Sequence, residues 1–323
     1  MKAIRIHAPG GPEALKHDDV AEPTPGQGQA VVKIEASGVN FIDVYFRTGA
    51  YKAPLPLTLG LEGAGTVTAV GPGVGEVKVG DRVAWTGVPG SYAQMNVIPA
   101  NRLVKLPDGL SFKDGAAAML QGMTAHYLMV SSYPVKKGDT CLVHAAAGGM
   151  GLLLCQLGKM RGATVIGTVS TEEKAALAKA AGADHVILYI KQDFEAEVKR
   201  ITDGRGVDVV YDGVGASTFD KGLSCLRPRG MMVLFGQASG PVPPLDLQVL
   251  NARGSLFVTR PSLNHHIATR EELLQRAGDV LGWIRDGKLK LRIEHQFPLA
   301  QAADAHRALE GRKSTGKILL IPG

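Results

Sequence analysis

The stretch LVHAAAGGMG, residues 142–151, decides the fold, because an apolar strand runs there directly into a loop with adjacent glycines. A dinucleotide-binding turn has glycines where the chain bends, where the backbone touches pyrophosphate and where the helix packs on the strand. Ala146, Gly148 and Gly151 occupy these three places, with Ala in the first. A helical segment follows the loop, and a second apolar strand, 163–169, comes at the expected distance. We therefore expect a pyrophosphate on the amides that open this helix, with an ordinary tight turn as the alternative.

The end of that second strand indicates which dinucleotide binds. An acidic residue there would hold the ribose 2′-hydroxyl and repel a 2′-phosphate. This chain instead has Ser170 and Thr171, with Lys174 one helical turn later. Glu172 and Glu173 stand at a helix start, where they favour the dipole and are expected to face solvent. The pattern favours NADPH over NADH; an ordinary surface role for Lys174 is the alternative.

Around the glycine loop, apolar strands alternate with helical segments, the pattern of a doubly wound parallel sheet of the α/β class. The expected strands are 140–146, 163–169, 185–189, 207–212, 230–236 and 255–259. The expected helices are 150–161, 172–181, 193–202, 217–226 and 270–286. Gly162 and Gly182 stand where helix C-terminal caps are expected.

The rest of the chain predicts a second domain. With 323 residues the chain is long enough for two domains of ordinary size. Residues 1 to about 120 have short strand-like runs separated by Gly and Pro, which predicts an all-β body. The ending returns to strand, helix and strand. We expect one domain over 1–123, a nucleotide domain inserted at 124–265, and a return to the first domain over 266–323.

The composition of the chain limits the binding partners and the cell compartment that we expect. The formal charge of +6 comes from dispersed Lys and Arg with no long run of like charge, so no specific nucleic-acid partner is expected. Cys141, Cys155 and Cys225 lie in apolar segments, which favours buried thiols in a reducing compartment. No signal-peptide core and no apolar run of membrane-spanning length appears, so no membrane association is expected and the cytoplasm is the predicted location.

We expect no metal. A structural zinc needs clustered ligands, and a catalytic zinc needs three protein ligands with an open position. All three cysteines lie in the predicted nucleotide domain, and the nine histidines are dispersed. The chain also lacks a G-x-S-x-G nucleophile elbow and a phosphate loop that ends in Lys-Ser or Lys-Thr. Hydride transfer without a metal is the chemistry that remains.

Several segments in order resemble a known family: ASGVNFIDVYFRTGAY, LEGAGTV, HAAAGGMGLLLCQ, VVYDGVG and VTRPSL. They are similar to the zinc-free NADPH:quinone oxidoreductases, the zeta-crystallin-like branch of the medium-chain dehydrogenase/reductase superfamily. The resemblance implies a GroES-like β-rich catalytic domain with an inserted Rossmann-type domain. Asn40 stands where zinc-containing relatives have a cysteine ligand, and Leu61 stands where they have a histidine. Glu62 persists in that motif, as a structural acid or a catalytic one.

The resemblance also implies the coenzyme contacts. The 2′-phosphate would meet Ser170, Lys174, Tyr189 and, from the C-terminal return, Arg312. The remaining implied contacts, around the nicotinamide and the pyrophosphate, are Asn40, Tyr45, Tyr127, Gly148, Gly149, Met150, Phe235, Gly236 and Arg260.

For catalysis, a protein must hold a flat quinone against the nicotinamide and donate hydrogen bonds to the oxygen that gains charge. Asn40, Tyr45 and Tyr51 are the candidates, because amide and phenol groups donate while remaining neutral. Asn40 orienting the nicotinamide, and interdomain packing of the two tyrosines, are the alternatives. Asp43 is expected to cap a helix rather than to act as a base.

Three functions stay open on the sequence: NADPH-dependent reduction of quinones, reduction of an enone or alkenal double bond, and NADPH binding with little catalysis. The resemblance further implies a homodimer that pairs through the edge strand GSLFVT, residues 254–259, whose edge would otherwise be exposed.

Overall fold

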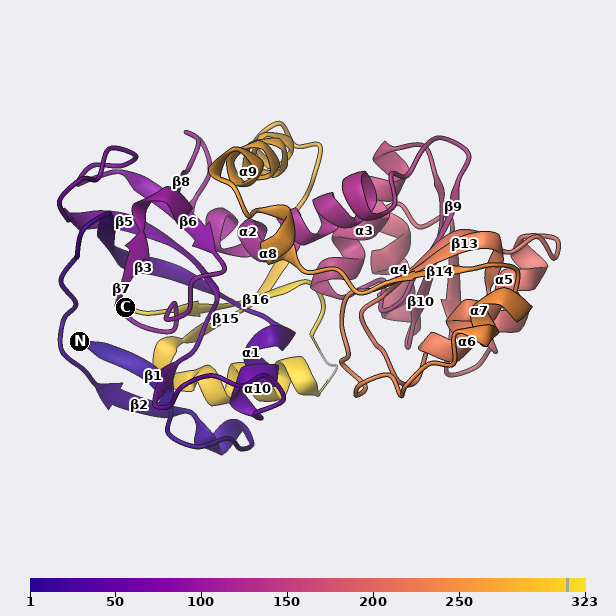
Figure 1. Cartoon of the computed structure of the whole chain (residues 1–323), viewed down its shortest axis with the longest axis horizontal. Coiled ribbons are helices and arrows are strands. Elements are labelled where there is room, and N and C mark those ends of the chain that lie inside the picture. The colour runs from indigo at the N-terminus through magenta and orange to yellow at the C-terminus, as the bar shows by residue number, and fades with distance from the viewer. Residues whose placement is uncertain (312–313) are drawn as a thin grey trace. The chain divides into compact units, whose positions relative to one another are not determined.

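The computed structural model describes residues 1–311 and 314–323 and divides into two compact units. The first unit comprises Met1–Met123 and Ile267–Gly323, and the second comprises Thr124–His266. Figure 1 shows that the first unit contains the indigo and yellow ends of the chain. The second unit is therefore continuous in sequence, whereas the first is assembled from two separate segments.

The first unit is built on β-sheets. Its larger sheet has the strand order β15-β16-β3-β5-β6-β8, with β7 also paired to β3, and its smaller sheet has the order β2-β1-β4. The strands of the larger sheet are β3 (Gln29–Val39), β5 (Glu62–Val70), β6 (Arg82–Thr86), β7 (Met95–Pro99), β8 (Val104–Lys105), β15 (Ile293–Pro298) and β16 (Lys317–Ile321). Those of the smaller sheet are β1 (Lys2–Ile6), β2 (Lys16–Asp19) and β4 (Leu57–Thr58). Because β16 pairs antiparallel with β3, the C-terminal segment completes the sheet that the N-terminal segment begins.

Helices are fewer in this unit. They are α1 (Phe41–Arg47), α9 (Arg270–Arg285), α10 (Ala302–Glu310) and most of α2 (Phe112–Tyr127), with short 3₁₀ turns at Pro12–Ala14, Ala100–Arg102 and Leu299–Gln301. Trp85, fully buried, packs with Val32 and Val67 in the core beneath the larger sheet.

The expectation of an all-β body up to about residue 120 is wrong at its end, where α2 begins. Ser111 and Asp114 cap this helix reciprocally: the Ser111 N–H donates to Asp114 Oδ2 at 2.8 Å, and the Asp114 N–H donates to Ser111 Oγ at 3.1 Å. This is the capping-box arrangement, and the Ser-x-x-Asp spacing was a signal for it in the sequence. A π-helical turn, Leu128–Ser132, follows α2.

The second unit is the predicted doubly wound parallel sheet, and the α/β fold class is confirmed. Its strands run in the order β11-β10-β9-β12-β13-β14, and every neighbouring pair is parallel. They are β9 (Thr140–Val143), β10 (Thr164–Val169), β11 (His185–Leu188), β12 (Val207–Asp212), β13 (Leu226–Leu234) and β14 (Phe257–Thr259). The helices are α3 (Gly149–Met160), α4 (Glu172–Ala180), α5 (Phe194–Ile201), α6 (Phe219–Ser224), α7 (Gln248–Ala252) and α8 (Leu263–His266). Figure 1 shows α3 and α4 on one face of this sheet and α5 and α6 on the other.

The strand order reverses direction between β9 and β12. In doubly wound sheets, ligands bind outside the carboxyl ends of the strands at this switch point. Gly162 and Gly182 end α3 and α4 with φ of +78° and +104°, as expected of C-terminal caps. No helix in the described part of the chain is long and apolar enough to cross a membrane.

Candidate active site

The glycine loop lies at the switch point, directly after β9. Ala145 adopts a left-handed conformation with φ of +52°, and Gly148 caps α3 in an extended conformation. A side chain at Gly151 would place its Cβ 2.3 Å from the Ala145 carbonyl oxygen, so only glycine lets the helix approach the loop this closely. Gly149 and Met150 form the first turn of α3, where amide groups and the helix dipole favour an anion.

Ser170 and Tyr189, two of the residues predicted to meet a 2′-phosphate, directly follow the neighbouring strands β10 and β11. The Tyr189 N–H donates to the Val169 carbonyl oxygen at 3.1 Å, which brings Tyr189 beside the strand end that leads to Ser170. Thr171 caps α4, and its Oγ1 accepts from the Lys174 N–H at 3.3 Å. Glu172 is 73% exposed and pairs with Lys191, as expected of an acid that faces solvent.

Asp212, which sequence analysis did not single out, organises the loop after β12. Its Oδ1 accepts from the Val214 and Gly215 N–H groups at 2.7 and 3.0 Å, and its Oδ2 accepts from the Thr218 hydroxyl at 2.8 Å. Asp212 is fully buried, so these bonds fix the loop next to the switch point. The acid between the apolar strand and the glycines of the motif VVYDGVG was the available signal.

Phe235 and Gly236 follow β13 and lie against this same loop. The Phe235 N–H donates to the Asp212 carbonyl oxygen at 2.8 Å. A Cβ at Gly236 would lie 2.5 Å from the Gly213 carbonyl oxygen, so the backbones of the two loops pack directly on each other and leave no room for a side chain at this position. The structure therefore brings both predicted residues to the carboxyl edge of the sheet.

Tyr127 and Arg260 also lie in the second unit. Tyr127 is 2% exposed, and its ring stacks on His266 with centroids 4.2 Å apart and planes 9° apart. Burial raises the pKa of the Tyr127 phenol, and the nearby positive charge of Arg260 lowers it. Arg312 lies outside the described residues.

In the first unit, Asn40 lies between β3 and α1, and Asp43 Oδ2 accepts from the Asn40 N–H at 2.8 Å. The helix is therefore present as expected, but Asn40 is the capping residue and Asp43 acts from the third helical position. The Asn40 side chain is directed into the unit: its Nδ2 donates to Glu62 Oε1 at 2.7 Å, and its Oδ1 accepts from Lys317 Nζ at 2.7 Å and Gln121 Nε2 at 3.2 Å.

Glu62 and Lys317 form the centre of this cluster. Both are buried, and the Lys317 ammonium forms an ion pair with Glu62 Oε1. Glu62 Oε2 accepts from the Leu120 N–H at 2.6 Å. A Cβ at Gly38 would lie 2.2 Å from Glu62 Oε1, so glycine is required beside the carboxylate. Lys317 was missed by sequence analysis, although a single lysine at the start of the apolar strand KILLI was a signal for it.

Tyr45 and Tyr51 are brought together on the outer side of α1. Their ring centroids lie 5.2 Å apart, and Phe46 contacts Tyr51 edge-on at 5.7 Å. Both tyrosines are half-buried. Their contact with a substrate stays a prediction.

Behind α1 lies a second buried polar network. Tyr92 donates its hydroxyl hydrogen to Asp43 Oδ2 at 3.0 Å and lies 3.2 Å from His306 Nε2. Arg47 donates to His306 Nδ1 at 3.0 Å and forms two 2.8 Å bonds to the Glu310 carboxylate. Burial raises the pKa of Asp43 to about 7, and burial together with the Arg47 charge lowers the pKa of His306 to about 3. The network joins α1 to α10.

Two family descriptions match the chain: "Alcohol dehydrogenase GroES-like domain" over residues 26–108 and "Zinc-binding dehydrogenase" over residues 149–277. A quinone oxidoreductase of Pseudomonas aeruginosa is 46% identical over 323 residues, which cover 99% of each chain. The crystal structure of Escherichia coli quinone oxidoreductase complexed with NADPH covers all of both chains with a TM-score of 0.98 and 43% identity. The chain belongs to the quinone oxidoreductases of the medium-chain dehydrogenase/reductase superfamily. A 2-haloacrylate reductase of Burkholderia is also 44% identical, over 100% of this chain and 99% of its own length.

Membership of the quinone oxidoreductases confirms the resemblance drawn from the sequence motifs. Among the residues that the structure describes, no group of three or more His, Cys, Asp or Glu side chains has the arrangement of a metal site. Of the two positions where the sequence resemblance implies a replaced zinc ligand, Asn40 is held in the cluster with Lys317.

Proposed function

We propose that this chain catalyses the NADPH-dependent reduction of quinones by direct hydride transfer, without zinc. The observation that carries the proposal is the glycine loop at the switch point of the parallel sheet, next to a strand end that has Ser170 and Lys174 in place of an acid. The names of the Pseudomonas and Escherichia relatives, one of them complexed with NADPH, support the same coenzyme and substrate class.

The second unit fits the coenzyme. Its pyrophosphate would lie on the amides of Gly148, Gly149 and Met150, because Gly151 allows α3 to begin against the loop. Ser170, Lys174 and Tyr189, with Arg312 from the C-terminal segment, would hold the 2′-phosphate. Tyr127, Phe235, Gly236 and Arg260 would line the rest of the site, with Asn40 and Tyr45 from the first unit. When bound, NADPH supplies a hydride.

The first unit supplies the polar groups for the substrate. The phenol hydroxyls of Tyr45 and Tyr51 donate hydrogen bonds to the quinone oxygen that gains charge. The Asn40 amide is held by Glu62, Gln121 and Lys317, and its Nδ2 also donates to the Gly38 carbonyl oxygen at 3.4 Å, so a hydrogen bond to the substrate would replace this long one. The proton that completes the reduction comes from water. The proposal therefore needs no general acid from the chain.

A turnover assay tests this proposal. NADPH oxidation is compared for 1,4-benzoquinone, a larger ortho-quinone, a short alkenal and 2-chloroacrylate, with the protein-free rate subtracted. The proposal expects turnover with the quinones. Turnover confined to the alkenal or to 2-chloroacrylate would replace it with the second candidate below, and NADPH binding with no turnover on any electrophile would favour a binding protein.

Reduction of an electron-poor carbon–carbon double bond is the second candidate function. The specific observation is the 2-haloacrylate reductase, whose identity of 44% is close to the 46% of the Pseudomonas quinone oxidoreductase. The same coenzyme and the same hydrogen-bond donors would serve both reactions.

We propose a homodimer in the cytoplasm. At the edge of the six-stranded sheet, β14 exposes Phe257 by 55% and Val258 by 36%, and a second copy of the same edge would cover them. Phe257→Asp is expected to yield a monomer in light-scattering measurements; an unchanged mass would rule out this interface. Cys141, Cys155 and Cys225 are free and buried, which supports a reducing compartment.

A further inference from the structure

A hollow of about 560 Å³ opens on the second unit, lined by Arg205, Arg227, Pro228 and Arg229. These residues lie at the amino ends of β12 and β13. The glycine loop and the Asp212 loop follow the carboxyl ends of the same sheet. Since β12 spans six residues, about 16 Å of extended chain separates the two edges. The hollow is thus distinct from the proposed coenzyme site.

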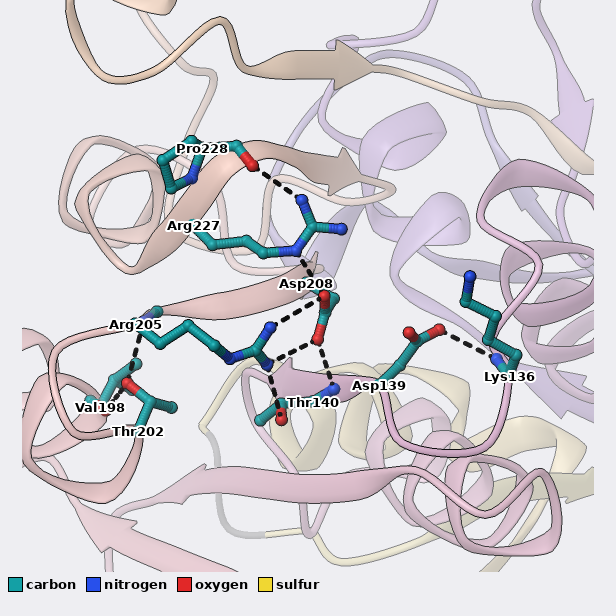
Figure 2. A network of polar contacts seen from close by, with 10 residues as sticks. Lys136, Asp139, Thr140, Val198, Thr202, Arg205, Asp208, Arg227 and Pro228 are labelled. Atoms are coloured by element: carbon teal, nitrogen blue, oxygen red, sulfur yellow. Dashed lines mark hydrogen bonds and ion pairs between the residues drawn. The ribbon is translucent and has the colours of Figure 1, made fainter.

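A buried carboxylate holds two of the arginines. Figure 2 shows Arg205 and Arg227 converging on Asp208 from different segments of the chain. Arg205 Nη2 donates to Asp208 Oδ2 at 2.8 Å, and Arg227 Nε donates to Asp208 Oδ1 at 2.5 Å. The Thr140 N–H adds a third bond at 2.7 Å, and the Asp208 side chain is only 6% exposed. These bonds and the two positive charges outweigh burial and lower the pKa of Asp208 to about 2. Both guanidinium groups are therefore fixed in orientation before any ligand arrives.

An irregular segment of β13 supplies the third arginine. Val207 and Val209 of β12 pair with Leu226 and Met231 of β13, so Arg227–Gly230 form an insertion in the ladder. Such insertions re-aim side chains and occur next to functional sites. Arg229 has a left-handed φ of +62°, which is uncommon for a residue with a side chain.

The backbone of the Arg229 segment is held from outside the strand. The Arg229 N–H donates to the Gly254 carbonyl oxygen at 2.7 Å, and a Cβ at Gly254 would lie 3.0 Å from Pro228 Cα. Within residues 1–311 and 314–323, the exposed Arg229 side chain has no hydrogen bond or ion pair, and its backbone adopts a strained left-handed conformation. Strained residues of this kind concentrate at ligand-binding sites.

The charges around the hollow favour an anion. Three arginines line the hollow, and one carboxylate, Asp208, pairs with two of them, Arg205 and Arg227. Asp139 is a second acid nearby, with its Oδ2 accepting from the Lys136 N–H at 2.9 Å. Arg205 uses three donor contacts on Asp208 and Thr140, and Arg227 donates to Asp208, Pro228 and Tyr133. Each guanidinium has five N–H donors, so both keep donors for a ligand.

We propose that this hollow binds the phosphate group of a small phosphomonoester. The planar, forked donors of arginine match pairs of phosphate oxygens, and a dianion is favoured where positive charge is in excess. The hollow is open to solvent, so the arginines would hold the phosphate group and the organic part of the ligand would lie beside Pro228.

Calorimetric titration of the full chain with glucose 6-phosphate, and with glucose as the uncharged counterpart, tests the proposal. Saturating NADPH is present throughout, so that the proposed coenzyme phosphate sites are filled. Arg229→Asn removes one guanidinium and keeps a residue that tolerates positive φ. Arg200→Gln is the matched control, because Arg200 is a 70% exposed arginine of the same unit, on α5.

The proposal expects glucose 6-phosphate to bind and glucose not to bind. Arg229→Asn should weaken the binding of glucose 6-phosphate about tenfold, because one charge-assisted contact is lost. Arg200→Gln should change this affinity less than about twofold. Equal losses of glucose 6-phosphate affinity in the two variants would indicate diffuse attraction by net charge and would overturn the proposal. So would an absence of binding by the parent, or binding that Arg229→Asn leaves unchanged in a protein that still takes up NADPH.

Discussion

The ammonium group of Lys317 forms an ion pair with the carboxylate of Glu62 in the interior of the first unit, although 255 residues separate the two in sequence. Lys317 begins β16 and Glu62 begins β5, and both strands flank β3, so the pair joins the C-terminal segment to the N-terminal one. Asn40 contacts both charges. The residue proposed to meet the substrate is thus positioned by a contact between the two ends of the chain.

Removing one partner of this pair leaves the other charge buried and uncompensated. Lys317→Met is expected to lower the free energy of unfolding by about 3–5 kcal/mol, measured by urea denaturation. The double variant Lys317→Met/Glu62→Gln should recover part of the loss. Lys105→Met, which breaks a pair whose lysine is 58% exposed, should cost less than about 1 kcal/mol. Equal losses of unfolding free energy for Lys317→Met and Lys105→Met would contradict a buried, coupled pair of Lys317 and Glu62.

The network behind α1 predicts opposite pH dependences for two variants. Asp43 has a raised pKa, so its contribution to the stability of the fold falls as pH rises from about 4 toward 7. His306 has a lowered pKa, so its contribution to the stability rises as pH increases from about 3 to 6.5. In the parent, the fall in stability from Asp43 and the rise in stability from His306 largely cancel. Relative to the parent, Asp43→Asn should gain stability with pH between about 4.5 and 6, and His306→Gln should lose it, each by up to about 1.4 kcal/mol per pH unit. Denaturation curves at several pH values measure this, and variants that run parallel to the parent would refute it.

Lys174 is predicted to select the phosphorylated coenzyme. Lys174→Glu places a negative charge where the 2′-phosphate would lie, so NADPH binding should weaken about tenfold or more while NADH binding changes little. Fluorescence titration with each coenzyme measures both affinities. Lys179→Glu is the matched control, since Lys179 stands in the last turn of the same helix, α4. If both coenzymes bound Lys174→Glu as well as they bind the parent, the phosphate would lie elsewhere.

Gly151 is predicted to be irreplaceable at the coenzyme loop. Gly151→Ala forces a Cβ to within 2.3 Å of the Ala145 carbonyl oxygen, so α3 must shift and both stability and NADPH affinity should fall. Gly278→Ala, in the open interior of α9, meets no atom within 4 Å and should raise the free energy of unfolding by up to about 1 kcal/mol. Thermal unfolding with and without NADPH compares them. Tight NADPH binding by Gly151→Ala would show that the loop is not the pyrophosphate site.

The parts of the fold that sequence predicts well are those with local signals. β12 is found at its predicted bounds, and α3, α4 and α5 begin or end within one residue of theirs, because apolar periodicity, N-caps and C-terminal glycines are set by neighbours in the chain. The strand expected at 230–236 begins four residues earlier, at Leu226. The insertion at Arg227–Gly230 hid its start, since Pro228 and Gly230 read as a turn.

The parts of the site that sequence misses are those made by distant residues. The glycine loop and the residues after β10 follow from spacing within one βαβ unit. Lys317 is buried only because Glu62 lies opposite, and Asp43 and His306 share the Tyr92 hydroxyl only because α10 lies behind α1. Burial of a charged residue depends on its partner, and no pattern in one short stretch of sequence reveals that partner.

Single-turnover oxidation of bound NADPH tests the central claim most directly. Protein loaded with NADPH is mixed with 1,4-benzoquinone, and the decay of the reduced coenzyme's absorbance is compared for ordinary coenzyme and for coenzyme deuterated at C4 on the transferred face. Direct hydride transfer predicts a decay that the quinone triggers and that deuterium slows severalfold. A bound coenzyme that stays reduced after mixing, while the quinone is demonstrably present in excess, would contradict the account.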